Sequence, residues 1–388
     1  MLYATHAEID LDAIAHNVRQ VRAIAPAAKV LVAVKANAYG HGAVAVARHL
    51  ERHRLADWFG VATTPEGIEL RTAGITTPIL RLSPAFPEEL AALIAAGIPP
   101  AVADRPTIMA VAEAAAAQGR SGYPVQLAID TGMRRIGCEP ADAVATAMLI
   151  AEQPALDLQG LFTHLPVSDA PVGQEFTANQ LAGFAQTVAA IQAARAAQGL
   201  SPVPLVHAAN SGAILGHELG GTTLVRPGIM AYGYYPDPES TPRPVGLRQA
   251  VCWKSRISFV KRVAAGQSVG YGHTWTAPVD SWIGTVPVGY ADGYSRSNSN
   301  RGRMLIGGRS WPVAGRVCMD QTMLDLGPVT PGEPAPVAVG DEVVLLGGQG
   351  DEFIGTDELA TLMGTISYEV TCLIAPRVTR IHLGDPGE

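Results

Sequence analysis

The sequence predicts an α/β plus β protein, in which an N-terminal (β/α)8 TIM-like barrel precedes a C-terminal mainly-β domain. Up to about residue 230, short apolar segments alternate with alanine-rich stretches that favour helices. After Tyr234 the segments become short and β-branched and are separated by glycine or proline, as is typical of all-β domains. A chain of 388 residues is long enough for both domains.

The barrel prediction depends on eight short apolar segments that are spaced by helix-forming sequence. The expected strands are Lys29–Val34, Phe59–Ala62, Pro78–Leu82, Pro100–Ala103, Val125–Ile129, Gly160–Thr163, Leu205–His207 and Thr223–Val225. Stretches such as Glu88–Gly97 and Val111–Gln118 are rich in alanine and predict the helices between them. An open doubly wound sheet is the alternative, but no Gly-x-Gly-x-x-Gly pattern follows the first strand.

The second domain is predicted from β-branched segments that follow a proline-rich connection. Tyr235–Leu247 contains four prolines and is expected to be a linker. The strands expected after it are Trp253–Val263, Ile283–Pro287, Arg303–Ile306, Trp311–Val317 and Glu342–Leu346. We therefore place the barrel at residues 11–235 and the β domain at residues 236–388.

Composition and charge exclude several classes of function. The net charge is −7 and the chain has no basic tract, which argues against a nucleic-acid partner. The four cysteines are far apart, so neither a metal site nor a disulfide framework is expected. Acidic residues stand where a signal peptide needs basic ones, and no uncharged apolar run reaches spanning length. We expect a cytoplasmic protein with no membrane partner.

Lys35 is the residue from which the chemistry is predicted. It closes the first apolar strand and opens the loop Ala36–Gly42, which puts a primary amine at the C-terminal mouth of the barrel. A partly desolvated amine at that position can form a Schiff base with an aldehyde such as pyridoxal 5′-phosphate (PLP). Lys35 taken alone is also typical of a lysine that only extends into solvent from a strand end, and the residues described next are what favour PLP.

Other polar residues follow barrel strands and are expected at the same mouth. They include Tyr39, Arg135, His164 and Arg226. The loops after strands seven and eight of such barrels often bind a phosphate, and these loops hold Asn210, Ser211, Gly228 and Ile229. A serine hydroxyl and free backbone N–H groups at a turn suit a phosphate. Asn210-Ser211 alone is also typical of a helix cap.

With these segments identified, nearly the whole chain closely resembles the PLP-dependent alanine racemases. The matching motifs, in order, are VKANAYGHG at Lys35, DTGMxRxG at Asp130–Gly137, FTH at Phe162–His164, NSG at Asn210–Gly212, VRPGI at Val225–Ile229, VGYGHTW at Val269–Trp275, GYADGY at Gly289–Tyr294, GRVCMDQ at Gly315–Gln321 and TISYEV at Thr365–Val370. So many motifs in one order make the resemblance specific. It implies a PLP-binding barrel plus a β domain that includes the N-terminal strand 1–10.

The resemblance implies a role for each matching residue of the barrel mouth. Lys35 is the Schiff-base lysine and one catalytic base, and Arg226 faces the PLP ring nitrogen. His164 lies beside the ring face, and Arg135 binds the phenolic oxygen of the cofactor and the substrate. The residues implied around the phosphate are Tyr39, Asn210, Ser211, Gly228, Ile229 and Tyr368.

The resemblance also implies a homodimer whose active sites are shared. Tyr271 resembles the second base, which reaches the site from the partner subunit, and Met319 resembles a partner residue near the substrate carboxylate. Tyr290 and Asp320 resemble residues that shape the entry. The implied reaction interconverts L-alanine and D-alanine, which supplies D-alanine for cell-wall synthesis or degrades it.

Two departures from the family pattern bear on these roles. The family often has a carbamylated lysine where this chain has Ala128, so Arg135 needs another partner, and chloride is our first choice. Leu165-Pro166-Val167 follows His164 in place of the usual small or polar residues. A racemase that accepts a broader range of small amino acids is therefore the alternative to a strict alanine racemase. A PLP decarboxylase is disfavoured by the Gly-Tyr271-Gly segment and by Arg226, and a non-catalytic PLP-binding barrel is disfavoured by the presence of a β domain.

Overall fold

The computed structural model describes residues 3–237 and 239–384. The chain divides into two compact units. The first, here called the β unit, comprises residues 1–12, 39–41 and 249–388, and the second, the barrel unit, comprises residues 13–38 and 42–248. Within the described ranges, none of the helices has the length and apolar character needed to cross a bilayer.

The barrel unit contains eight parallel strands that lie in chain order. They are β2 (Lys29–Ala33), β3 (Trp58–Val61), β4 (Ile79–Arg81), β5 (Ala101–Val102), β6 (Tyr123–Ala128), β7 (Leu156–Phe162), β8 (Leu205–His207) and β9 (Leu224–Val225). They form two four-stranded sheets, β4-β3-β2-β9 and β5-β6-β7-β8. A parallel bridge between Arg81 and Pro100 joins β4 to β5, and a hydrogen bond from Thr223 N to Val206 O joins β9 to β8. These links close the predicted barrel.

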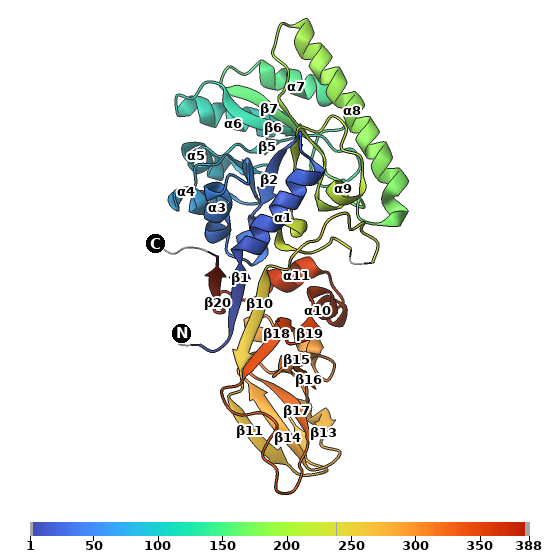
Figure 1. The fold of residues 1–388 in the computed structure, drawn as a ribbon. Helices are drawn as coiled ribbons and strands as arrows, with labels where there is room; N and C mark the ends of the chain where they lie inside the picture. Colours follow the sequence, from blue (N-terminus) through green and yellow to red (C-terminus); the bar gives the residue numbers. More distant parts are fainter. Residues whose placement is uncertain (1–2, 238, 385–388) are drawn as a thin grey trace. The chain divides into compact units, whose positions relative to one another are not determined.

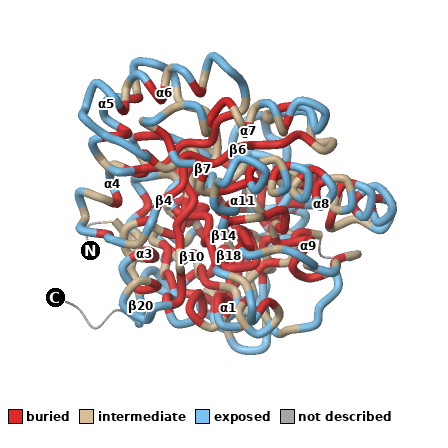
Figure 2. Tube along the Cα trace, turned by 90° about the horizontal axis from the view of Figure 1, so that it is seen from above, coloured by how far each residue is buried: buried red, intermediate tan, exposed pale blue. Residues whose placement is uncertain are grey.

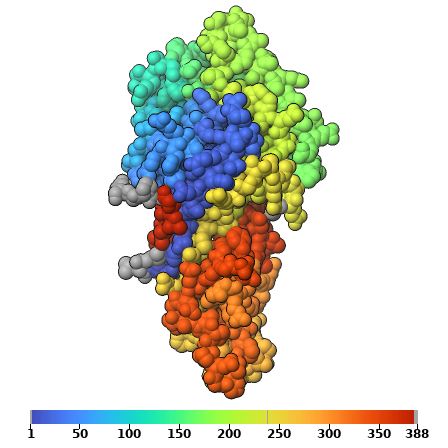
Figure 3. Space-filling view, in the orientation of Figure 1, coloured from blue at the N-terminus to red at the C-terminus, as the bar shows by residue number. Residues whose placement is uncertain are grey.

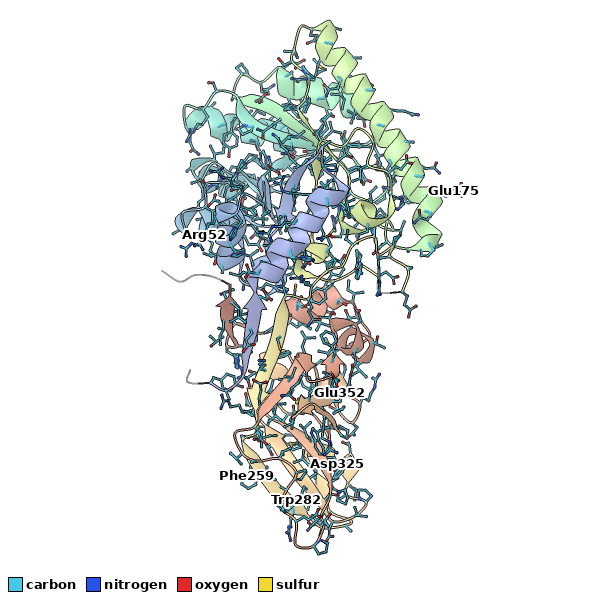
Figure 4. All side chains as sticks on the ribbon, viewed as in Figure 1. Arg52, Glu175, Phe259, Trp282, Asp325 and Glu352 are labelled. Atoms are coloured by element: carbon cyan, nitrogen blue, oxygen red, sulfur yellow. The ribbon has the colours of Figure 1, made fainter. Side chains whose placement is uncertain are left out.

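Helices follow the strands and cover the outside of the barrel (Figure 1). They are α1 (Leu11–Ile24), α3 (Ala43–Arg52), α4 (Thr64–Thr72), α5 (Pro87–Ala95), α6 (Arg105–Ala117), α7 (Ala143–Ala151), α8 (Gln174–Ala197) and α9 (Ser211–Gly216). The short segment α2 (Lys35–Tyr39), directly after β2, is a turn with left-handed residues rather than a regular helix. Figure 2 shows the strands buried and the outer sides of these helices exposed. The long helix α8 lies on the surface of this unit (Figure 3), and Glu175 at its start points into solvent (Figure 4).

The barrel interior is filled by large apolar side chains from neighbouring strands. One buried cluster comprises Leu31, Trp58, Leu80, Leu205 and Leu224, with Leu82 packed against it. These side chains come from five strands, so their burial ties the two sheets together. Burial of one leucine of this kind contributes about 2 kcal/mol.

Residues 236–237 and 239–248 pack with the barrel unit, although the sequence analysis assigns them to the β domain. Its hydrogen bonds explain this difference. The Asn17 side chain donates to Arg248 O and accepts from Arg248 N, both at 2.8 Å. The hydroxyl of Tyr235 donates to Val245 O at 2.6 Å. The proline-rich segment is therefore tied to α1 and to the end of the barrel.

The β unit is built on a sheet to which the N-terminus contributes. Its order is β16-β15-β18-β10-β1-β20, with β19 paired to β18. The strands are β1 (His6–Asp10), β10 (Val251–Arg256), β15 (Arg303–Ile306), β16 (Arg309–Pro312), β18 (Glu342–Gln349), β19 (Glu352–Ile354) and β20 (Thr379–Leu383). Strand β1 runs antiparallel to β10 and parallel to β20 (Figure 1).

A second sheet of the β unit has the order β11-β14-β17. Its strands are β11 (Phe259–Val263), β14 (Ser281–Val286) and β17 (Thr322–Pro328), and a separate pair joins β12 (Ser268–Val269) to β13 (Trp275–Thr276). Phe259, Trp282 and Asp325, labelled in Figure 4, come from its three strands. The predicted strand Trp253–Val263 is wrong as a single strand, because the buried Ile257 separates β10 from β11.

Two further differences from the sequence analysis lie in the β unit. The predicted strand Trp311–Val317 is wrong in its bounds, because β16 spans Arg309–Pro312 and pairs with β15, whereas Val313 beyond it makes an isolated bridge to Leu324 in β17. The unit also contains the helices α10 (Thr356–Met363) and α11 (Ser367–Cys372), so its architecture is mainly β rather than all β. Gly364 ends α10 in the left-handed conformation, with φ 71°.

Candidate active site

Lys35 directly follows β2 and begins an unusual turn. Ala36, Asn37, Ala38 and Tyr39 have φ values of 52°, 53°, 54° and 53°, so four consecutive residues that are not glycine adopt the left-handed conformation. Each such residue costs roughly 1–2 kcal/mol relative to a right-handed one. Strain of this kind is found where the surrounding structure holds it in place, often at functional sites.

Hydrogen bonds from several elements hold this turn. The Ala36 backbone N donates to Glu66 Oε1 at 2.7 Å, and Ala38 N donates to Val34 O at 2.8 Å. The Asn37 side chain accepts from Ala43 N at 2.8 Å and so links the turn to the start of α3. Lys35 is thus placed at the end of β2 by α3 and α4 together.

Four basic side chains gather at the mouth of the barrel unit: Lys35, Arg135, His164 and Arg226. Burial, followed by the positive charges of Arg226, Arg135 and Lys35, lowers the pKa of His164 to about 3. Burial, and then the charge of Arg135, lowers the pKa of Arg226 to about 10. The mouth therefore combines a neutral imidazole with three cationic groups, and it favours an anionic ligand.

Arg226 follows β9 and is 7% exposed. Its Nη1 donates to His207 Nδ1 at 2.8 Å. Its Nη2 donates to Thr163 O at 2.8 Å, to Ala208 O at 3.0 Å and to His164 Nδ1 at 3.2 Å. All four acceptors are neutral, so in the described chain this buried guanidinium has no carboxylate partner.

The loops after β8 and β9 meet at Ser211. Its Oγ accepts hydrogen bonds from Gly228 N at 3.0 Å and Met230 N at 3.4 Å, and Ile229 between them is fully buried. Asn210 caps α9, because its Oδ1 accepts from Ala213 N at 3.1 Å. The two loops predicted to hold a phosphate are thus joined through a hydroxyl, and Asn210 serves as a helix cap.

Arg135 is exposed in this chain, and among the described residues it forms no hydrogen bond or ion pair. The neighbouring Arg134, in contrast, pairs with Glu139 at 2.6 Å. The surroundings of Ala128 are apolar, since it packs with Ala101, Phe162 and Ile136. No acidic side chain of the described chain pairs with Arg135 in place of the carbamylated lysine that the resemblance implies.

Tyr39 and Tyr368 come together in the β unit, where their ring centroids are 6.1 Å apart. Burial raises the pKa of Tyr39, which is 8% exposed, so its hydroxyl stays protonated at neutral pH. Gly40 has a φ of 85°, and a β-carbon there would come within 2.1 Å of Thr371 O in α11. The glycine therefore allows the close approach of the Tyr39 segment to α11.

Three other predicted residues of the β unit line one surface pocket of about 570 Å³: Tyr271, Met319 and Asp320. Tyr271 stands between Gly270 and Gly272, which have φ values of 75° and 72°. Its side chain is 71% exposed. The two glycines thus present a tyrosine to the outside of its own chain, as a contribution to a partner's site requires.

The two segments that carry the predicted entry residues Tyr290 and Asp320 are connected through backbone packing and one arginine. A β-carbon at Gly289 would lie 2.3 Å from both Cys318 O and Met319 O, so glycine lets the two segments touch. Arg377 donates to Asp320 Oδ1 at 2.8 Å and binds the buried Asp292 through two hydrogen bonds.

The structure thus sorts the predicted residues into a barrel-mouth group (Lys35, Arg135, His164, Asn210, Ser211, Arg226, Gly228 and Ile229), the tyrosine pair (Tyr39 and Tyr368) and a pocket group (Tyr271, Met319 and Asp320). Tyr290 does not line the pocket, but its backbone N donates to Cys318 O at 3.1 Å beside it. Sequence reasoning assigned no role to Gln126, His207 or Arg377. Gln126 and His207 are polar residues in otherwise apolar strands, and this sequence pattern indicates that they need buried hydrogen-bond partners.

The mouth of the barrel unit fits PLP. Lys35 supplies an amine for the aldehyde, the buried Arg226 offers N–H donors to a ring nitrogen, and the Ser211 loop offers a hydroxyl and backbone amides to a phosphate. The net positive charge suits a phosphate and a phenolate together. A lysine-bearing barrel joined in one chain to a mainly-β unit defines a PLP-dependent enzyme of the barrel-plus-β class.

Comparison with known proteins identifies the family. Residues 9–236 match the model of the alanine racemase N-terminal domain, and residues 250–382 match that of the C-terminal domain. The chain therefore belongs to the alanine racemase family, whose members are PLP-dependent isomerases.

Relatives match over nearly their full length. The chain is 50% identical to the alanine racemase of Cutibacterium acnes over 98% of each chain. The crystal structure of alanine racemase from D-cycloserine producing Streptomyces lavendulae is 37% identical, with a TM-score of 0.88 over 99% of this chain and 98% of that one. A histidine racemase from Leuconostoc mesenteroides subsp. sake is 29% identical, with a TM-score of 0.86 over 99% of each.

Proposed function

We propose that this protein interconverts L-alanine and D-alanine by using two bases on opposite faces of the substrate. The observation that carries the proposal is the gathering of Lys35, Arg135, His164 and Arg226 at one mouth. The full-length relatives named alanine racemase support the choice of substrate.

When it is bound, PLP supplies the electron sink that makes the α-proton of an amino acid removable. Lys35 holds the cofactor and moves a proton at its Nζ on one face. The Tyr271 hydroxyl of a partner subunit moves a proton on the other face, so neither group has to cross the substrate. The 71% exposure of the Tyr271 side chain supports a role outside its own chain.

Arg226 controls the electronic character of the site. A guanidinium has a pKa above about 12 in water and donates hydrogen bonds without transferring a proton. Even with its pKa lowered to about 10, Arg226 stays charged at neutral pH. It therefore binds a ring nitrogen without protonating it, which weakens the electron sink and favours simple return of the proton over transamination.

The remaining residues bind and orient. We assign the phosphate to Ser211, Gly228 and Ile229 with Tyr39 and Tyr368, while Asn210 supports this loop as a cap. Arg135 is assigned to the phenolic oxygen and the substrate carboxylate, with chloride as its partner. Met319, Tyr290 and Asp320 are assigned to the substrate end of a homodimeric site.

Circular dichroism with single amino acids tests the reaction. Purified holoenzyme incubated with L-alanine is expected to bring the signal to zero at equimolar enantiomers, and D-alanine is expected to reach the same end point. Release of carbon dioxide would favour a decarboxylase, and an unchanged signal with bound PLP would favour a binding protein. Borohydride is expected to fix the cofactor to the peptide that contains Lys35, and a Lys35→Ala protein that is still labelled would contradict this role.

A broader small amino-acid racemase is the second candidate. The structural likeness to a histidine racemase and the apolar Leu165-Pro166-Val167 segment favour testing it. The same measurement with L-serine, L-valine and L-histidine distinguishes the two, because a strict alanine enzyme leaves these signals unchanged.

We further propose that the protein works in the cytoplasm and that its D-alanine serves cell-wall synthesis. The thiols of Cys138, Cys252 and Cys318 are free, which supports a reducing compartment. Rescue of a D-alanine auxotroph by the gene would test the biosynthetic role, and growth restored only by added D-alanine would contradict it.

A further inference from the structure

We infer that Gln126 is a positioning residue that fixes the ring tautomer of His207 and, through it, the orientation of Arg226. Three side chains form a row inside the barrel unit. Gln126 Oε1 lies 2.7 Å from His207 Nε2, and His207 Nδ1 lies 2.8 Å from Arg226 Nη1. The inference rests on the proposed function only in assigning Arg226 to the cofactor ring.

The direction of these hydrogen bonds follows from the chemistry of the three groups. A guanidinium has only donors, so His207 Nδ1 must accept. Burial and the charge of Arg226 lower the pKa of His207 well below its usual value, so the ring is neutral and its single proton is on Nε2. Nε2 therefore donates, and Gln126 must present its oxygen rather than its nitrogen.

The packing shows that this row is built into the barrel. Gln126 and His207 are both 0% exposed. Gly160 in β7 lies opposite Gln126 in the register, and a β-carbon on it would come within 2.7 Å of the amide carbon of Gln126. The ring of Phe162 stacks on His207 at 5.1 Å with an angle of 8° between the planes. Phe162 thus fixes the plane of the His207 ring, and Gln126 holds the single ring proton of His207 on Nε2.

Loss of the acceptor at position 126 has a specific consequence. His207 can then place its proton on Nδ1, where it points at Arg226 Nη1 and breaks that hydrogen bond. Because this hydrogen bond has a charged donor and is stronger than a neutral one, we expect kcat to fall on the order of tenfold in both directions. A residue that only fills space would not move the proton.

Nitrogen NMR of histidine-labelled protein reads the tautomer directly. In wild-type protein, with and without PLP, the His207 signals are expected to show a protonated Nε2 and an unprotonated Nδ1, and a His207→Asn sample identifies them. Gln126→Met is expected to mix the tautomers and lower kcat, whereas Gln126→Glu, which keeps an acceptor, is expected to retain the wild-type tautomer. Gln192→Met is the matched control, since within the described part of the chain the Gln192 side chain forms hydrogen bonds to the backbone of Val203 alone.

The outcomes separate this inference from the proposed function. A protonated Nδ1 in the wild-type protein overturns the inference without any variant. An unchanged tautomer and unchanged kcat in Gln126→Met also overturn it. If Gln126→Met does not fold, Gly160→Ala, which displaces the amide, is expected to mix the tautomers, and an unchanged tautomer there overturns the inference. Because the NMR readout needs no racemisation, inactivity toward alanine would contradict only the proposed function.

Discussion

The carboxylate of Glu66 binds the backbone N–H of Ala36 at 2.7 Å, so the first turn of α4 holds the strained residue next to Lys35. The same carboxylate accepts from Ala62 N at 2.8 Å and from Thr63 N at 3.1 Å. One side chain therefore connects the start of α4, the end of β3 and the residue after the proposed catalytic lysine. The conformation of the turn leads to the first prediction.

Ala36→Gly is expected to leave the free energy of unfolding nearly unchanged or to raise it. Glycine adopts the left-handed conformation without the strain of roughly 1–2 kcal/mol that alanine has there. This gain offsets the larger loss of backbone entropy when a glycine folds. Ala92→Gly, at an exposed position of the right-handed helix α5, is the control and is expected to lower stability by about 1 kcal/mol. Urea unfolding measures both, and an equal loss at the two positions would show that the left-handed turn carries no strain.

Inactive Lys35→Ala and Tyr271→Ala subunits are expected to restore activity when they are mixed. In a dimer with shared sites, one of the two sites then contains both bases, which gives up to about a quarter of wild-type activity on random exchange. Activity after demonstrated subunit exchange is the measurement. No recovery would argue that Tyr271 acts within its own chain or not at all.

Arg226→Glu is expected to lower racemisation and to increase side transamination. A carboxylate at this position stabilises a protonated ring nitrogen and so strengthens the electron sink. The ratio of racemisation to pyridoxamine formation is the measurement, together with the visible spectrum of the holoenzyme. If neither the spectrum nor the ratio changes, Arg226 does not face the ring.

The free energy of unfolding is expected to fall as the pH decreases below about 6.5. The folded pKa of His164 is about 3, below its unfolded value of about 6.5, so only the unfolded state gains the proton between these values. His164 alone contributes up to about 2 kcal/mol of this loss between pH 7 and pH 5. Urea unfolding at both pH values is expected to show a smaller loss in His164→Gln, and equal losses would place the effect elsewhere.

Chloride is expected to raise activity to a plateau at fixed ionic strength. Ala128 stands where the family resemblance implies a carbamylated lysine, and no acid of the described chain pairs with Arg135. Arg135→Ala is expected to abolish the chloride response, whereas Arg134→Ala, which removes a surface pair with Glu139, is expected to keep it. Indifference to chloride, with a carboxylate seen against Arg135 in a crystal structure, would rule out the anion.

The barrel strands were predictable because each is an apolar run that ends in a turn signal. Leu205–His207 is observed as predicted, and the predicted Lys29–Val34 is one residue shorter. Their two-sided burial leaves a continuous apolar pattern that is hard to miss. The sequence also showed which residues follow each strand, and so which residues share the mouth.

Other features depend on contacts that no local pattern reveals. The helix cap formed by Asn210 fits the local pattern of Asn210-Ser211, but the hydrogen bond from its side chain to Leu165 O reaches another loop that the pattern does not indicate. The row of Gln126, His207 and Arg226 joins strands far apart in sequence, so its register becomes visible only once the barrel closes. In the same way, the helices α10 and α11 are too short for a helical period to stand out among the strands.

Because no carboxylate of the described chain pairs with Arg226, binding of the cofactor and folding of the chain are thermodynamically linked. Without a bound anion, the charges of Arg226, Arg135 and Lys35 repel one another at the mouth, and this repulsion is a cost carried only by the folded chain. A phosphate-bearing ligand relieves that cost, and at a thousand times its dissociation constant a ligand adds about 4 kcal/mol to stability. The supply of PLP in the cell would therefore set how long the chain stays folded as well as how fast it catalyses its reaction.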